Sequence, residues 1–196
     1  MHTLKLSSLF FAAIILSACA RPMIVTPNLD KIGQISTNQQ INKNVAYLIS
    51  SDVLTKEVTT PGGGGDKVTY YPYRDIETGF YKVLSNVFAN VTKLKSASDA
   101  ETISKNNIVF LITPTIVTDS SSPSALTWPP TKFSTELTCR VTDKLGNLIL
   151  ETKVTGNGAA EFDEFKKDLS LSGKRSTEDA LIKLQQALLN APELRK

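Results

Sequence analysis

The segment between Asp75 and Val91 carries the pattern that most restricts the fold of this chain. Its apolar residues recur at intervals of three and four, which is the spacing of one buried face of an amphipathic helix. They are Ile76, Phe80, Val83, Leu84, Val87, Phe88 and Val91. Asp75 is placed to cap the N-terminus. The opposite face is polar and nearly uncharged, so we expect this helix to pack on a sheet rather than to lie on a membrane.

Four other segments have the patterns of strands. They are residues 44–50, 108–112 with a continuation through 118, 133–141 and 148–155. The second is nearly continuously apolar, as in a strand buried on both faces. In the third, Leu137 and Cys139 share one face and Glu136 and Arg140 the other, which is typical of a half-buried antiparallel strand. The fourth returns as its partner, and residues 156–158 close this hairpin.

A second long helix is predicted over residues 177–190, because its apolar residues again fall on one face and Pro192 follows its end. Residues 98–105 predict a short helix capped by Ser98. Residues 52–60 either continue the first strand or form a helical turn. The order of these elements predicts an α+β fold, in which a mixed or antiparallel sheet is covered mainly on one face by the two longer helices.

A run of four glycines and a cluster of tyrosines contain candidate partner-binding residues. Gly63 and Gly64 belong to the loop at residues 61–67. A phosphate-binding loop would need a Lys-Ser or Lys-Thr pair that leads into a helix, so a mobile hairpin-like loop is the better interpretation. Tyr71 is one of three tyrosines in residues 68–73, an aromatic strand pattern. This cluster is either a binding face or cross-strand packing.

The loop at residues 119–130 supplies two further candidates. It is rich in serine and proline, and it holds Leu126 and the single tryptophan, Trp128. Long irregular loops in compact domains are often functional, and tryptophan offers a large amphipathic contact to a partner. The alternative is that Trp128 folds back over the end of the sheet.

The N-terminus carries the motif with the most specific chemical meaning. Residues 9–16 are apolar and follow a basic start, but a permanent bilayer span takes about 20 residues, so the run fits a secretory signal. It ends in Leu16-Ser17-Ala18-Cys19, which resembles the lipobox of bacterial lipoproteins. The resemblance implies that residues 1–18 are removed and that Cys19 is lipidated on its sulfur and acylated on its new amine. The alternative is an ordinary signal peptide with an incidental cysteine.

The resemblance also predicts where the mature protein lies and how it is divided. Several acyl chains on Cys19 would hold it in a membrane almost irreversibly. Ala20 stands where an aspartate would favour the inner membrane in such lipoproteins, so we expect the periplasmic face of the outer membrane. The polar residues 19–44 predict a flexible linker that reaches at most about 80 Å, unless a strand is hidden at residues 23–26. Residues 45–196 then form a single periplasmic domain.

Composition argues against most catalytic chemistry. The single histidine, His2, lies in the signal peptide, and a mature chain without histidine has no Ser-His-Asp or Cys-His nucleophile and almost no zinc-hydrolase arrangement. Cys139 is left alone once Cys19 is lipidated, so no intramolecular disulfide is expected. The mature chain would carry 21 basic and 19 acidic residues, a balance that argues against a nucleic-acid partner. We therefore expect no enzymatic activity, no cofactor and no metal.

The order of elements on a lipidated tether is similar, over about residues 45–189, to the small outer-membrane lipoproteins of the penicillin-binding-protein activator, curli-secretion and YajG-like type. This resemblance implies an accessory subunit that binds an envelope protein complex, such as a secretion machine, a cell-wall synthase or a transporter. A single hairpin with Glu136 and Arg140 on its outer face argues against a pore. The alternatives are a carrier of an apolar ligand or lipid between sheet and helices, and an enzyme that uses the acids of residues 161–164.

Overall fold

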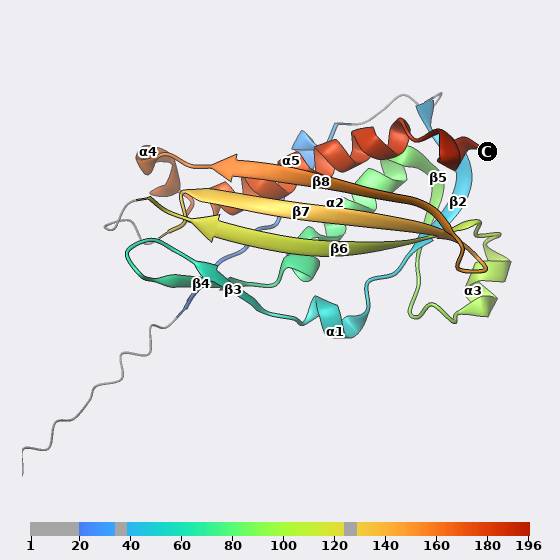
Figure 1. Cartoon of the computed structure of the whole chain (residues 1–196), viewed down its shortest axis with the longest axis horizontal. Helices are drawn as coiled ribbons and strands as arrows, with labels where there is room; N and C mark the ends of the chain where they lie inside the picture. The colour runs from blue at the N-terminus through green and yellow to red at the C-terminus, as the bar shows by residue number, and fades with distance from the viewer. Residues whose placement is uncertain (1–19, 34–38, 124–128) are drawn as a thin grey trace, which may run out of the picture.

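A five-stranded mixed sheet is the frame of the molecule in the computed structural model, which describes residues 20–33, 39–123 and 129–196 (Figure 1). Its strands lie in the order β5-β2-β6-β7-β8. They are β2 (Ile41–Tyr47), β5 (Phe88–Lys93), β6 (Phe110–Ser121), β7 (Lys132–Asp143) and β8 (Leu148–Ala159). β2 pairs in parallel with β5 and β6, whereas β6, β7 and β8 form an antiparallel meander.

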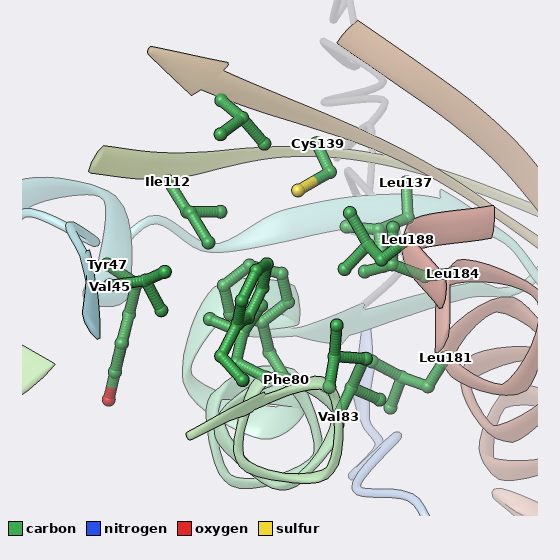
Figure 2. Close-up of a cluster of buried hydrophobic side chains, with 14 of the residues drawn as sticks. Val45, Tyr47, Phe80, Val83, Ile112, Leu137, Cys139, Leu181, Leu184 and Leu188 are labelled. Atoms are coloured by element: carbon green, nitrogen blue, oxygen red, sulfur yellow. The ribbon is translucent and has the colours of Figure 1, made fainter. Parts of the chain in front are cut away.

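Two long helices, α2 (Pro72–Val87) and α5 (Leu171–Leu189), cover one face of this sheet. The space between the layers is filled by buried side chains from both helices and from β2, β6 and β7 (Figure 2). Phe80, Leu181 and Leu184 are at most 1% exposed, and Cys139 points into the same core. The predicted fold class, an α+β fold with two longer helices on one face of a mixed sheet, is confirmed.

The boundary between α2 and β5 differs from the helix predicted over residues 75–91. The helix begins at Pro72, whose fixed φ suits the first turn. Asp75 therefore lies inside that turn rather than at the cap. The helix ends at Val87, and Phe88 starts a strand that runs beside β2. The helical spacing of the apolar residues continues beyond Val87, but pairing with β2 decides the backbone conformation of residues 88–93.

A second, three-stranded sheet lies at one end of the large one. It has the order β1-β4-β3 and consists of β1 (Arg21–Pro22), β4 (Lys67–Tyr70) and β3 (Val58–Pro61). Hydroxyl groups join it to β6: Tyr70 donates to Thr118 Oγ1 at 2.7 Å, and Ser120 lies 2.6 Å from Thr60 Oγ1. The rings of Tyr70 and Phe133 pack at 5.3 Å.

The short elements are η1 (Leu29–Lys31), α1 (Ser51–Leu54), α3 (Ala100–Lys105), α4 (Phe162–Phe165) and η3 (Pro192–Arg195). For residues 52–60 the two alternatives were a continued strand and a helical turn, and α1 is the helical turn. The cap of α3 is Asp99, whose carboxylate accepts from Thr102 N at 3.1 Å, rather than Ser98. Asp99 is better placed, because its side chain reaches the third residue of the helix.

The predicted turn at residues 156–158 is part of a strand. β8 continues to Ala159, so Gly156 and Gly158 lie in the strand interior, both buried. A Cβ at Gly156 would lie 2.7 Å from Ala180 Cβ, and one at Gly158 would lie 2.5 Å from Ser176 N. The glycines are therefore present because α5 crosses β8 at backbone contact, not because the chain reverses there.

Candidate functional site

The N-terminal segment joins the fold beside the β3–β4 hairpin. Met23 N donates to Thr69 O at 2.8 Å, which continues the β1–β4 pairing. Arg21 lies opposite Val68 in a parallel ladder, so Ala20 lies on the side of Arg21 toward the tip of the hairpin. The ion pair between Arg21 Nε and Asp66 Oδ2, at 3.3 Å, lies at that tip. The start of the described chain therefore lies at the hairpin tip.

The residues after β1 are held from two sides. Val25 N donates to the buried carboxylate of Asp75 at 3.1 Å, and Thr177 Oγ1 donates to Val25 O at 2.8 Å. Asn28 N donates to Glu178 Oε1 at 2.9 Å. Asp75 belongs to α2 and the other two side chains to α5, so both long helices hold this segment. The bond from Val25 N to Asp75 is buried and made to a charged group, a kind worth about 1.5–3 kcal/mol, so the segment is fixed rather than loosely attached.

The flexible linker predicted for residues 19–44 is consequently wrong for its described parts. Met23, Val25 and Ile32 are buried, and β2 begins at Ile41. The alternative of a strand near residues 23–26 is closer to the structure, although the strand lies at Arg21–Pro22. These apolar residues are too scattered to show a period, and they are buried because they join two separate apolar clusters, Met23 and Val25 one and Ile32 the other. One residue, Ala20, separates Cys19 from β1, so the Cα atoms of residues 19 and 21 lie within about 8 Å.

The glycine run forms a tight hairpin turn. Gly62 N donates to Asp66 O at 2.8 Å and Asp66 N to Gly63 O at 3.1 Å. Gly64 and Gly65 have φ values of 65° and 85°, the left-handed region that both central residues of a type I′ turn occupy. Glycine is required here for conformation, which accounts for the run without any phosphate. Gly63 is buried and Gly64 is exposed.

A surface hollow of about 720 Å³ lies at this turn. It is lined by residues 59–67 together with Ser122 and Pro123, so it contains both Gly63 and Gly64. Leu126 and Trp128, the other loop candidates, lie outside the described residues, and their role stays a prediction. The hollow is lined mainly by backbone and small side chains, an arrangement suited to contact rather than to chemistry.

The tyrosine cluster is divided between packing and surface. Tyr70 is 1% exposed and packs on Phe133, and the hydroxyl of Tyr73 accepts a hydrogen bond from Ile116 N at 3.2 Å. Tyr71 is half-buried beneath Arg74, whose guanidinium carbon lies 4.0 Å from the ring centroid. Tyr71 does not line the hollow at the hairpin, so the structure does not bring it together with Gly63 and Gly64.

The opposite end of the molecule carries an apolar surface that the sequence patterns did not reveal. There the β7–β8 turn lies beside α3 (Figure 1). Leu145 at the turn is 80% exposed and borders two hollows of about 520 and 310 Å³, which also share Ala97 and Lys144. Beneath them is a small apolar cluster around Leu94 and Ile108. A single exposed leucine in a turn has no period, so the only sequence signal was its apolar character.

The β7–β8 turn is itself rigid. The carboxylate of Asp143 accepts from Leu145 N at 2.8 Å, from Asn147 N at 2.9 Å and from Asn147 Nδ2 at 2.8 Å. These bonds, the Asn147 side chain first, hold the pKa of Asp143 below its usual value. Gly146 has a φ of 87°. These hydrogen bonds fix the conformation of the turn, and they therefore also fix the exposed position of Leu145.

Side chains of α5 cap the free edge of β8. Lys183 Nζ donates to Thr155 O at 2.8 Å, and Arg175 Nη1 donates to Ala159 O at 2.8 Å. Between them, Asn157 N donates to Asp179 Oδ2 at 2.9 Å. The three helix residues are four positions apart and so follow one line along α5, and they occupy backbone groups that would otherwise recruit another strand. This half of the edge is closed to strand addition.

The acidic stretch at residues 161–164 has structural roles. Glu161 and Glu164 form the capping box of α4, and Glu164 also pairs with Arg175 at 2.6 Å. Hydrogen bonds from Arg175 and from Glu161 N lower the pKa of Glu164 to about 2. Glu164 is therefore ionised at neutral pH and unsuited to act as a general acid. Among the described residues, no group of three or more histidine, cysteine or acidic side chains is placed to hold a metal ion.

Cys139 is fully buried, and burial raises the pKa of its thiol to about 12. The inward placement predicted from the alternation of β7 is confirmed. The thiolate is the reactive form of cysteine, so this thiol is inert in the folded protein.

Comparisons with known proteins do not identify a family for this chain. No family model matches the chain, and no curated protein matches it. Similar solved structures include a DUF330 protein from Xanthomonas campestris, with 14% identity, a TM-score of 0.42 and coverage of 87% of this chain and 91% of that one. A minor lipoprotein from Acinetobacter baumannii has 9% identity and a TM-score of 0.44, with 74% and 92% covered.

A Helicobacter pylori homolog of a neuraminyllactose-binding hemagglutinin has 13% identity and a TM-score of 0.43, with 80% and 85% covered. At these values the similarities assign neither a family nor a function to this chain. In the part of the chain that the structure describes, no helix is long and apolar enough to cross a membrane.

Proposed function

We propose that this protein is a non-enzymatic lipoprotein, acylated on Cys19 at the periplasmic face of the outer membrane, which binds an envelope protein complex as an accessory subunit. The observation that carries the proposal is the position of Leu16-Ser17-Ala18-Cys19 directly before the first strand. Cleavage before Cys19 would leave a mature chain whose described residues belong to the folded domain from Arg21 onward. Signal, anchor and domain are then consecutive, without a spare segment between them.

The surface at the far end supports the binding part of the proposal. Leu145 is 80% exposed, and Leu148 on the next strand is 51% exposed. A large apolar side chain held in water by a rigid turn, beside hollows that can receive partner side chains, is suited to contact with another protein. Because β1, which would follow the acylated Cys19 after one residue, lies at the opposite end, this surface would face away from the membrane.

The carrier alternative finds less support. An apolar ligand between the sheet and its helices would need an internal cavity, but the side chains of α2, α5 and the sheet fill that space in the described structure (Figure 2). The hollows described above lie at the surface, at the two ends of the sheet.

Replacing Cys19 by serine tests the anchor. We expect the wild-type protein to fractionate with membranes and to yield an N-terminal peptide that begins at Cys19 with its acyl chains, because several chains bind a bilayer almost irreversibly. The C19S variant is expected to lose the acyl chains and the stable membrane association. Mass spectrometry of the N-terminal peptide and membrane fractionation measure both effects. An unmodified wild-type peptide that begins elsewhere would contradict the lipoprotein assignment.

A photoreactive residue at position 145 in living cells tests the binding surface. We expect a discrete adduct with one envelope protein, identified by mass spectrometry, because the side chain at 145 would lie within the interface. Thr115, exposed on the open face of the sheet, is the matched control and should give no such adduct. The same substitution at Trp128 tests the contact predicted from the sequence. If neither 145 nor 128 captures a protein, the accessory-subunit proposal fails.

A further inference from the structure

The short connection between Cys19 and β1 restricts the orientation of the domain on the membrane as well as its location. Arg21 begins the first strand beside the hairpin tip, and residues 23–28 are held by α2 and α5. A domain whose first strand lies within about 8 Å of an acylated residue has no length of chain with which to stand off from the bilayer. One end of the domain must therefore lie against the surface that holds the acyl chains.

The end concerned is visible in Figure 1, where the β3–β4 hairpin, the ends of β6 and β8, and α4 lie together at one end of the long axis. Apolar side chains are exposed there. Phe162 on α4 is 61% exposed and Leu169 is 42% exposed. Ile24, 59% exposed, lies close to Leu169 because its backbone N donates to Ser170 Oγ at 3.3 Å. Large apolar side chains in such positions are unfavourable in water and favourable at a lipid interface.

Charges at this end are arranged in a way that does not repel phospholipids. Asp163 pairs with Lys166 at 2.9 Å and Asp168 with Lys174 at 2.8 Å, while Glu164 is paired with Arg175. The ammonium of Lys166 also lies 4.2 Å from the centroid of the Phe162 ring. This cation–π contact places a positive charge beside the exposed ring, where it can also attract lipid phosphates.

We infer that the end of the domain formed by the β3–β4 turn, α4 and the start of α5 lies on the phospholipid surface, with Ile24, Phe162 and Leu169 in contact with it. This inference rests on the proposed acylation of Cys19. It assigns the hairpin tip with Gly63 and Gly64 to the membrane rather than to a protein partner. The far end, with Leu145, then projects into the periplasm, since β7 and β8 of 12 residues each extend the sheet by about 40 Å.

Fluorescence quenching in vesicles tests this orientation. The full lipidated protein is reconstituted in vesicles of phosphatidylethanolamine and phosphatidylglycerol that contain a phospholipid with a nitroxide headgroup. A fluorophore is attached in separate variants, K167C beside α4 and L145C at the far end, both of which are exposed positions. The native cysteines do not interfere, because Cys19 is acylated in the proposed form and the thiol of Cys139 is buried and inert.

We expect the nitroxide to quench the fluorophore at 167 severalfold more than the one at 145. In the I24S/F162S/L169S background, quenching at 167 should fall while the protein still floats with the vesicles, whereas V117S, an exposed apolar residue on the open sheet face, should have no effect. Equal quenching at both positions, stronger quenching at 145, or no quenching of a vesicle-bound protein overturns the orientation alone. A protein that does not float, with an unacylated Cys19, overturns the proposed function as well.

Discussion

The G158A variant is expected to lose about 3 kcal/mol or more of its free energy of unfolding, a large effect for a single methyl group. Its Cβ would lie on the carbonyl oxygen of Ser172, 3.0 Å from the carbonyl carbon and 2.5 Å from Ser176 N. All of these atoms belong to the backbone of α5, which cannot rotate away as a side chain would. Overpacking of a rigid core costs about 1–3 kcal/mol and more where the backbone must shift.

Urea unfolding followed by circular dichroism measures this loss. G33A is the matched control, because a Cβ at Gly33 meets nothing within 4 Å and φ at that residue is not in the left-handed region. We expect the midpoint of G158A to fall strongly at an unchanged m-value, and that of G33A to stay close to the wild type. Equal midpoints for the two variants would mean that α5 does not cross β8 at backbone contact.

The backbone contact between α5 and β8 explains why the extents of these two elements could not be predicted from the sequence. Gly156-Asn157-Gly158 is a turn signal locally, and only the approach of α5 makes it a strand. The predicted start of α5 at residue 177 is wrong for a related reason, since the helix begins at Leu171. Ser172 and Ser176 are polar and interrupt the apolar period, but both are buried and donate to Pro130 O and Thr135 Oγ1.

The existence and order of the main elements were predictable because they depend on local periodicity. The alternation in β7 and the three-and-four spacing in α2 are properties of consecutive residues, and the structure confirms both elements. The α2–β5 boundary depends on a partner strand more than 40 positions away along the chain, as the pairing of Asn44 with Asn90 illustrates. A single sequence without related sequences does not report such a pairing.

The candidate site was the least predictable part of the molecule. The hairpin tip was recognised from its glycines, but its position beside the N-terminal chain follows from the β1–β4 pairing, which involves only two residue pairs. The backbone of Val25 is held by two helices that are about 100 residues apart in sequence, and its side chain packs on Val68 and Phe133. Leu145 stood out by no pattern at all. Surfaces are formed by distant segments, whereas sequence patterns report on neighbouring residues.

Replacing Phe80 by alanine is expected to cost about 3–5 kcal/mol, because the substitution leaves a cavity in a core that is otherwise filled. Phe80 is 1% exposed and lies at the centre of the cluster in Figure 2, with its ring 5.9 Å from that of Tyr47 in an edge-to-face arrangement. Thr78, exposed on the same helix, provides the control T78A, which should change stability by no more than about 0.5 kcal/mol. Urea or thermal unfolding of both variants measures the difference.

The F80A variant also distinguishes between the two proposed functions, the accessory subunit and the carrier of an apolar ligand. A new apolar cavity of this kind binds small molecules such as benzene, so benzene should raise the melting temperature of F80A and leave that of the wild type unchanged. A wild-type protein that benzene or a fatty acid stabilises as strongly as F80A would instead have an internal site of its own. That result would favour the carrier, since a protein that contacts the membrane at one end and a partner at the other needs no space between its sheet and its helices.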